Sequence, residues 1–197
     1  LNENLSGILN VYKPKGLTSH AVVSRVRKFY GVKRVGHAGT LDPMACGVLP
    51  VLVGSAASVQ ELVMGHDKTY KAGVLFGVTT DTGDVTGSVL NAKTPSFDGA
   101  ALKETLARFT GEIDQVPPMY SAVKVNGQKL YDLARKGREV ERPARDIIVH
   151  EMDLLDFDEN AQKGTLRCKV SKGTYVRTLV NDLGEKLGTL AVLHSLE

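Results

Sequence analysis

The chain has 197 residues, 42% of them hydrophobic, which is enough for a sizeable core in one large domain or two small ones. No apolar stretch reaches the ~20 residues that a membrane-spanning helix needs, so we expect no membrane partner and a cytoplasmic protein. The net charge is only +3, but residues 13–34 carry seven lysines and arginines, residues 163–177 carry five, and neither stretch has an acid, which favours a polyanion-binding face over ordinary solvated helix faces.

Hydrophobic patterning near the N-terminus predicts a strand followed by a helix. The strand covers residues 7–12 and ends at Lys13–Pro14. Thr18 or Ser19 is placed to cap a helix that runs to about residue 30 and ends at Gly31. The spacing of three side chains gives this helix one apolar stripe, formed by Val22, Val26 and Phe29.

The middle of the chain is predicted to be mainly strands. Residues 48–53 are a short apolar run typical of a buried strand, and residues 69–76 alternate with Tyr70, Ala72, Val74 and Phe76 on one side. A further strand, 85–90, is expected to return antiparallel after a turn around 81–84.

The C-terminal half is predicted to mix helices with a hairpin. Asp98 is placed to cap a helix that Gly111 closes, with Leu102, Leu106 and Phe109 on its buried side. Residues 117–145 are rich in glycine, proline and basic residues and indicate an exposed excursion. Residues 147–157 and 164–170 form a hairpin, and the last helix covers 174–187. The fold class is therefore α+β, with one mixed, mostly antiparallel sheet and flanking helices.

The run GHAGTLDPMACGVLP at 36–50 holds the residue that we expect to carry the chemistry, Asp42. Gly39 and Gly47 permit tight turns, and Pro43 biases Asp42 toward an extended backbone. The pattern predicts one carboxylate on a stiff loop beside a buried strand, a suitable place for a reactive group. The residues alone leave open both the reaction and the simpler interpretation as a turn.

The sequence gives no sign of a metal site. Cys46 and Cys168 form no ligand pattern and are expected to be reduced thiols, with Cys168 facing a core. The segment TDTGD at 80–84 has too few ligands for a calcium loop, so we interpret it as a turn. These residues therefore indicate no metal-binding pattern.

Five blocks resemble, in order, the TruB-type tRNA pseudouridine synthase family. They are VYKPKGLTSH at 11–20, GHAGTLDPMACGVLP at 36–50, KTYKAGVLFGVTTDTGD at 68–84, PPMYSAVKVNGQKLYDLARKG at 117–137 and SKGTYVRTLVNDLGEKLG at 171–188. The resemblance implies the pseudouridine synthase fold. It also implies isomerisation of a uridine in the T-arm loop of tRNA (position 55) without cofactor or metal, in an enzyme that we expect to be a monomer.

The resemblance also assigns catalytic roles. Asp42 matches the catalytic aspartate, Tyr70 the tyrosine that stacks on the target base, Tyr175 a second active-site tyrosine, and Arg177 the arginine that pairs with the aspartate. Simpler alternatives remain: Tyr70 as a core aromatic, Tyr175 as a packing residue, and Arg177 in a surface ion pair with Asp182.

A second set of matches concerns RNA binding. His37 matches the histidine that helps to hold the flipped RNA, although it can also hydrogen-bond its own loop. Lys13 and Pro14 match a motif that lines the pocket. Residues 120–142 match a mobile basic segment, the thumb, in which Lys124 and Arg135 are expected to contact RNA.

The implied chemistry is consistent with these residue types. A base inside a folded RNA loop has to be extruded before it reacts, and an aromatic side chain such as Tyr70 is suited to cover its exposed face. The sequence leaves open whether Asp42 attacks C1′ of the ribose, attacks C6 of the ring, or removes a proton to give a glycal. A base is also needed to take the proton from C5, for which Asp42, a water it orients or Tyr70 are candidates.

The resemblance treats residues 1–197 as one catalytic domain, without the C-terminal PUA domain that family members usually carry. Cys46 stands where a threonine is common in the family. Two other functions compete with the isomerase. An RNA-binding module would keep the basic surface and lose turnover, and a glycosidase would usually need a second carboxylate across the bond.

Overall fold

The structure, a computed structural model, describes residues 5–197. It divides into two compact units: the chain up to Asp67 together with Leu196–Glu197, and Lys68–Ser195. Strands within the described range form a three-stranded sheet, a five-stranded sheet and two two-stranded ribbons, so the expectation of a single sheet is wrong. The α+β class with mostly antiparallel pairing is confirmed.

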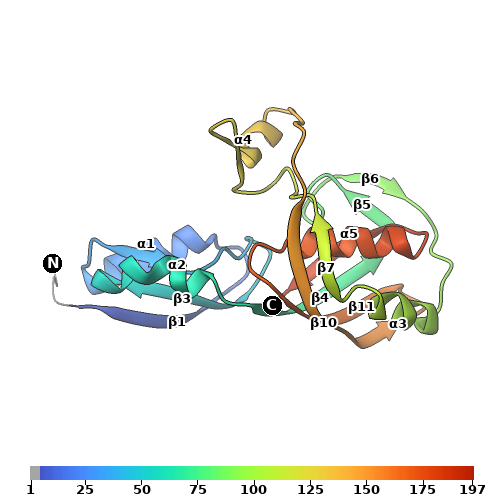
Figure 1. Ribbon diagram of the computed structural model, residues 1–197, viewed down its shortest axis with the longest axis horizontal. Helices are drawn as coiled ribbons and strands as arrows, with labels where there is room; N and C mark the ends of the chain where they lie inside the picture. The colour runs from blue at the N-terminus through green and yellow to red at the C-terminus, as the bar shows by residue number, and fades with distance from the viewer. Residues whose placement is uncertain (1–4) are drawn as a thin grey trace. The chain divides into compact units, whose positions relative to one another are not determined.

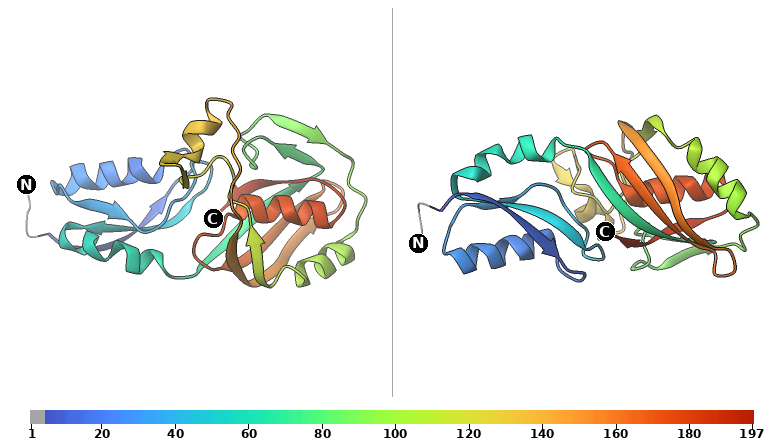
Figure 2. Two further views of the ribbon diagram at one scale, coloured as in Figure 1. Left: turned by 45° about the horizontal axis from the view of Figure 1, so that its top comes forward. Right: turned by 90° about the horizontal axis from the view of Figure 1, so that it is seen from below.

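The first unit is built on the sheet β1 (Gly7–Lys13), β3 (Gly47–Val53) and β2 (Val35–His37), with β3 in the centre and both pairings antiparallel. Helix α1 (Ser19–Tyr30) lies on one side of this sheet. The 3₁₀ segment η1 (Gly54–Val59) and helix α2 (Gln60–Met64) lie on the other side (Figure 2). The predicted strands at 7–12 and 48–53 are therefore present.

Helix α1 begins and ends where the sequence indicates. The Thr18 hydroxyl accepts a hydrogen bond from the Ala21 amide at 3.0 Å, and Gly31 ends the helix with a left-handed φ of 64°. The predicted stripe is partly wrong, because Phe29 is 81% exposed whereas Val22 and Val23 are buried.

The second unit is built on a five-stranded sheet in the order β12 (Ala191–Leu196), β4 (Lys68–Phe76), β11 (Lys163–Val170), β10 (Arg145–Asp158) and β7 (Gly111–Gln115). Helix α3 (Gly99–Ala107) contacts β10, and helix α5 (Val176–Lys186) contacts both β4 and α3 (Figure 1). The core comprises apolar side chains from these strands and helices, among them Ala72, Val74, Ile147, Leu166, Cys168, Leu102, Leu106, Leu179 and Leu183.

Two elements of the second unit have bounds that differ from those predicted. The strand expected at 85–90 is β6 (Val89–Ala92), which pairs antiparallel with β5 (Val78–Thr80). It starts late because the Asp84 carboxylate accepts hydrogen bonds from the Thr86 amide at 2.9 Å and the Thr82 hydroxyl at 3.0 Å, which keeps this segment in a turn. Helix α3 has the expected Asp98 cap but ends before Gly111, which starts β7.

Helix α5 and strand β12 approach each other closely at a glycine. A Cβ atom on Gly184 would lie 2.5 Å from the Ala191 amide nitrogen, so only glycine fits at this point of the helix. The close approach seats β12, a strand that the sequence patterning did not predict, against the end of α5.

The basic segment 120–142 contains a short ribbon, β8 (Lys124–Val125) with β9 (Gln128–Lys129), and helix α4 (Leu130–Ala134). Within this segment, Leu130 and Leu133 are buried, whereas most of the charged side chains are exposed. Figure 1 shows α4 beyond the end of β10, away from the five-stranded sheet. Among the residues described, no helix has both the length and the apolar character to cross a membrane.

Candidate active site

The Asp42 loop connects β2 to β3 and is fixed by its own backbone. The Ala45 amide donates to the Asp42 carbonyl at 3.0 Å, which closes a turn over Pro43 and Met44. The Gly16 amide donates to the Pro43 carbonyl at 2.7 Å. Asp42 itself is half-buried. The expected stiff loop with one carboxylate is thus present in the first unit.

Ser19 holds the residue that precedes Asp42. Its hydroxyl donates to the Leu41 carbonyl at 3.1 Å and accepts from the Leu41 amide at 3.0 Å. Ser19 is 4% exposed, so water does not compete for these bonds. The first residue of α1 therefore fixes the Leu41 peptide groups, next to Asp42.

Lys13 holds the other side of the loop. Its ammonium group donates to the carbonyl oxygens of Ala45 at 2.6 Å, Leu17 at 2.8 Å and Pro14 at 3.0 Å, and the residue is 0% exposed. Burial lowers the pKa of Lys13, while the nearby Cys46 and Asp42 charges oppose that shift. All three protons of the ammonium thus have backbone acceptors, and Lys13 cross-links the chain beneath the Asp42 loop.

His37 and Pro14 also belong to the first unit. His37 is the last residue of β2, is half-buried, and its Nδ1 is hydrogen-bonded to the Gly39 carbonyl of its own loop. Nδ1 therefore positions the ring, and Nε2 is the atom that remains to meet a ligand. Pro14 is exposed and directly follows the buried Lys13.

Tyr70 lies on β4 in the second unit. It pairs in register with Cys168 of β11, whose thiol lies 3.8 Å from the Tyr70 carbonyl. Ala72, Val74 and Phe76 of the same strand are buried, whereas Tyr70 is half-buried. The sequence correctly places Cys168 in the core.

Arg177, on the first turn of α5, is a buried cation. It is 5% exposed, and its guanidinium donates to the Thr82 carbonyl at 2.8 Å and to the Tyr120 carbonyl at 2.8 Å. A side chain this buried does not fit the alternative of a surface ion pair with Asp182. The turn at 80–84 thus has a function within the unit, because it presents the Thr82 carbonyl to Arg177.

Tyr175 immediately precedes α5 and is held through its backbone. Its amide donates to Gln115 Oε1 at 2.7 Å, and its carbonyl accepts from Gln115 Nε2 at 3.1 Å. Gln115 ends β7 and is 2% exposed. Sequence reasoning missed Gln115, since a single glutamine in GEIDQVPP carries no signal of this contact.

Asp182, also on α5, gives the protein a testable pH dependence. Burial, helped by the nearby Glu185, raises the pKa of Asp182 to about 6. Because the folded pKa exceeds the unfolded one, this group lowers the free energy of unfolding as the pH rises through about 4 to 6. We expect Asp182→Asn to raise that free energy by about 1 kcal/mol at pH 8, a value discounted because Asp182 is only half-buried.

Urea denaturation at pH 8 and at pH 4 measures this effect, with Asp156→Asn, at an exposed aspartate of β10, as the matched control. The gain should vanish at pH 4, where Asp182 is protonated in the folded protein. A variant that is destabilised at pH 8 would contradict the expectation.

The two predicted RNA contacts of the segment 120–142 are both exposed. Lys124 belongs to β8, and Arg135 follows α4 with its guanidinium carbon 5.5 Å from the centre of the Tyr131 ring. The Lys129 ammonium lies 5.3 Å from the same ring. Cation–π contacts of this kind order the two basic side chains around one aromatic ring.

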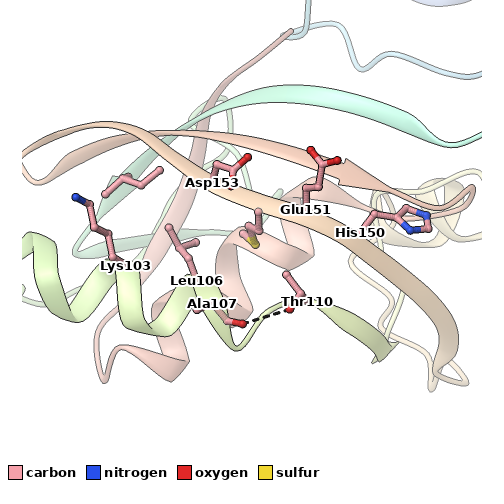
Figure 3. Close-up of a pocket in the computed structure, with 9 residues that line it drawn as sticks. Lys103, Leu106, Ala107, Thr110, His150, Glu151 and Asp153 are labelled. Atoms are coloured by element: carbon pink, nitrogen blue, oxygen red, sulfur yellow. Dashed lines mark hydrogen bonds between the residues drawn. The ribbon is translucent and has the colours of Figure 1, made fainter.

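A groove of about 500 Å³ lies between α3 and β10 (Figure 3). On one side it is lined by Lys103 and Leu106 of α3 and by Thr110 just before β7. On the other side it is lined by His150, Glu151 and Asp153 of β10. It contains none of the predicted site residues. Among the described residues, no group of three or more histidine, cysteine or acidic side chains is placed to hold a metal ion.

Comparison with known proteins identifies the family. The family described as "TruB family pseudouridylate synthase (N terminal domain)" matches residues 27–176. A protein of Caldanaerobacter subterraneus subsp. tengcongensis, named tRNA pseudouridine synthase B, is 50% identical over 185 residues, which are 93% of this chain and 65% of the relative. The protein of that name from Streptococcus pneumoniae serotype 2 is 46% identical over 98% of this chain and 68% of its own length.

Solved structures support the same assignment. A chain in the crystal structure of a Cbf5-Nop10-Gar1 complex is 29% identical, with a TM-score of 0.75 over 96% of this chain and 47% of that chain. A chain of an H/ACA RNP bound to a substrate RNA containing 2'-deoxyuridine is 25% identical, with a TM-score of 0.71 over 96% of this chain and 45% of its own. The chain spans 62–68% of the length of the curated relatives compared with it. By sequence and by fold, this chain belongs to the TruB family of pseudouridylate synthases.

Proposed function

We propose that the protein is a tRNA pseudouridine synthase that converts a uridine in the T-arm loop to pseudouridine. The observation that carries this proposal is the 45–50% identity, over nearly the whole chain, to relatives named tRNA pseudouridine synthase B. The chain spans about two thirds of their length, so the activity is transferred to it as a proposal. The proposed enzyme is cytoplasmic and monomeric, and it needs neither metal nor cofactor.

Asp42 is the proposed catalyst. Pseudouridine formation breaks the bond between N1 of the base and C1′ of the ribose, and joins C5 of the base to C1′ with loss of the C5 proton. A carboxylate on a fixed loop is suited to nucleophilic attack or to proton removal. Attack at C1′, attack at C6 and formation of a glycal all remain compatible with the Asp42 geometry. In each case, the bonds from Ser19 and Lys13 hold the loop in place before substrate arrives.

The second unit supplies the other proposed active-site residues. Tyr70 is half-buried at the start of β4, and stacking on an extruded base would contribute about 1–3 kcal/mol. Arg177 and Tyr175 are proposed as active-site residues positioned by the first turn of α5. The base must leave the RNA stack before any of them acts on it.

RNA binding is assigned to exposed or half-buried residues. Lys124 and Arg135 are exposed and would contact phosphates, and His37 offers the Nε2 side of its ring. Pro14 keeps its proposed role as a residue that lines the RNA-binding pocket. Because the Lys13 ammonium is buried on three carbonyl groups, we assign Lys13 to holding the loop rather than to contacting RNA.

Incubation with a T-arm stem-loop, followed by mapping of pseudouridine, tests the proposal. We expect one modified position in the loop, no free uracil, and no product when cytidine replaces the target uridine. Tritium placed at C5 of that uridine should appear in water as pseudouridine forms. Release of uracil would instead indicate a glycosidase, and tight binding without product would indicate an RNA-binding module.

A further inference from the structure

The start of α5 lacks the side-chain cap that helices usually have. Tyr175 occupies the cap position with an extended backbone, φ −101° and ψ 107°, and its side chain makes no capping hydrogen bond. Its carbonyl accepts the first hydrogen bond of the helix, from the Leu179 amide at 3.1 Å. Something other than the Tyr175 side chain must therefore define where α5 begins and how it is rotated.

Gln115 is placed to do this. Its carboxamide binds both polar groups of the Tyr175 backbone, accepting from the amide at 2.7 Å and donating to the carbonyl at 3.1 Å. Two bonds to one residue fix its rotation as well as its position. At 2% exposure Gln115 has little competition from water, and leaving either partner unpaired would be costly.

The backbone of Gln115 is held in a sheet, because β7 pairs antiparallel with β10 and Gln115 lies opposite Arg145 in that register. The chain then runs on to Tyr120, whose carbonyl accepts from Arg177 at 2.8 Å. The segment 115–120 thus contacts the helix start twice, at the Tyr175 backbone and at the Arg177 guanidinium.

We propose that Gln115 is a positioning residue for the reaction, which holds the Tyr175 backbone so that the Tyr175 ring and the Arg177 guanidinium are correctly placed. The inference rests on the proposed function, because it assumes that Tyr175 and Arg177 take part in pseudouridine formation. Gln115 acts only through these two residues, and it needs no contact with RNA.

The test replaces Gln115 by methionine, which has a similar volume and makes neither bond. We expect kcat on the T-arm stem-loop to fall by about 10- to 100-fold, since small misplacement of reacting groups has effects of this size. KM should stay within about 3-fold, because RNA binding does not involve Gln115. The Tm should fall by only about 2–4 °C, as for the loss of one helix cap.

Two further variants separate positioning from general destabilisation. Gln115→Glu keeps the acceptor for the Tyr175 amide but loses the donor to the Tyr175 carbonyl, so we expect a smaller loss of kcat than in Gln115→Met. Ile147→Val, in a buried residue of β10 that pairs with β7, should lower the Tm similarly and leave kcat unchanged. The proposal is overturned if Gln115→Met keeps the parental kcat. It is also overturned if Ile147→Val lowers kcat as much as Gln115→Met does.

Hydrogen exchange at the Tyr175 amide separates failure of this inference from failure of the proposed function. We expect this amide to exchange faster in Gln115→Met than in the parent protein and to stay protected in Gln115→Glu. If the parent protein makes no pseudouridine, the proposed function is wrong, and this measurement still tests the contact. An unchanged exchange rate in Gln115→Met would overturn the positioning role whatever the activity.

Discussion

Asp42→Asn is expected to lower the rate of pseudouridine formation by about 10,000-fold, as loss of a catalytic side chain does in well-studied hydrolases. Asparagine has nearly the same shape as aspartate but is neither a nucleophile nor a base at neutral pH. The bonds that hold the loop use the Leu41, Pro43 and Ala45 backbone groups and survive the change. T-arm RNA should therefore bind Asp42→Asn with nearly parental affinity.

Single-turnover kinetics with labelled T-arm RNA measures this loss, and filter binding measures the affinity. The matched control is Asp146→Asn, an exposed aspartate on β10 whose replacement should leave both quantities unchanged. Full activity in Asp42→Asn would remove this residue from the catalytic assignment. A loss of activity together with lost binding and a lowered Tm would mark Asp42 as structural.

Lys13→Met is expected to lower the free energy of unfolding by about 3 kcal/mol or more, because three carbonyl groups lose their buried donor. Methionine fills much of the space but donates no hydrogen bond. Urea denaturation measures the loss, and Lys15→Met is the matched control, since Lys15 is exposed two residues away. We expect Lys15→Met to change stability by less than about 0.5 kcal/mol.

Lys13 also decides between two roles for a lysine near the catalytic loop. If Lys13 holds the loop, Lys13→Met should lose kcat while the salt dependence of RNA binding stays the same. If it contacts a phosphate instead, the variant should keep its stability, and the slope of log affinity against log salt should fall by about one. The burial of Lys13 and its three carbonyl partners favour the first outcome.

Local signals predicted much of this fold. The Thr18 and Asp98 caps, the glycine at the end of α1 and the alternation in β4 and β11 act within a few residues, so the sequence displays them directly. Long-range pairing is different. Strand β12 depends on Gly184 and β4, and the division of the strands among separate sheets depends on which strands pair, so neither appears in a window of local sequence.

The candidate site shows the same division. Asp42 stands out because glycine and proline surround it, and this local pattern indicates a fixed loop. The partners that fix the loop, Lys13 and Ser19, lie more than twenty residues earlier, and their burial could not be read from their own neighbours. Phe29 shows the reverse error, because helical spacing indicated a buried side chain where α1 in fact faces solvent.

The connection between β1 and α1 serves two elements at once. Residues 13–19 supply the cap of a helix, and the same few residues supply both the ammonium and the hydroxyl that hold the Asp42 loop. The loop and the connection are therefore bonded to each other at several points. A designer who grafts residues 36–47 onto another scaffold should include residues 13–19 at their original length. Without them, the loop would lack the hydrogen bonds from Lys13 and Ser19 that hold its backbone.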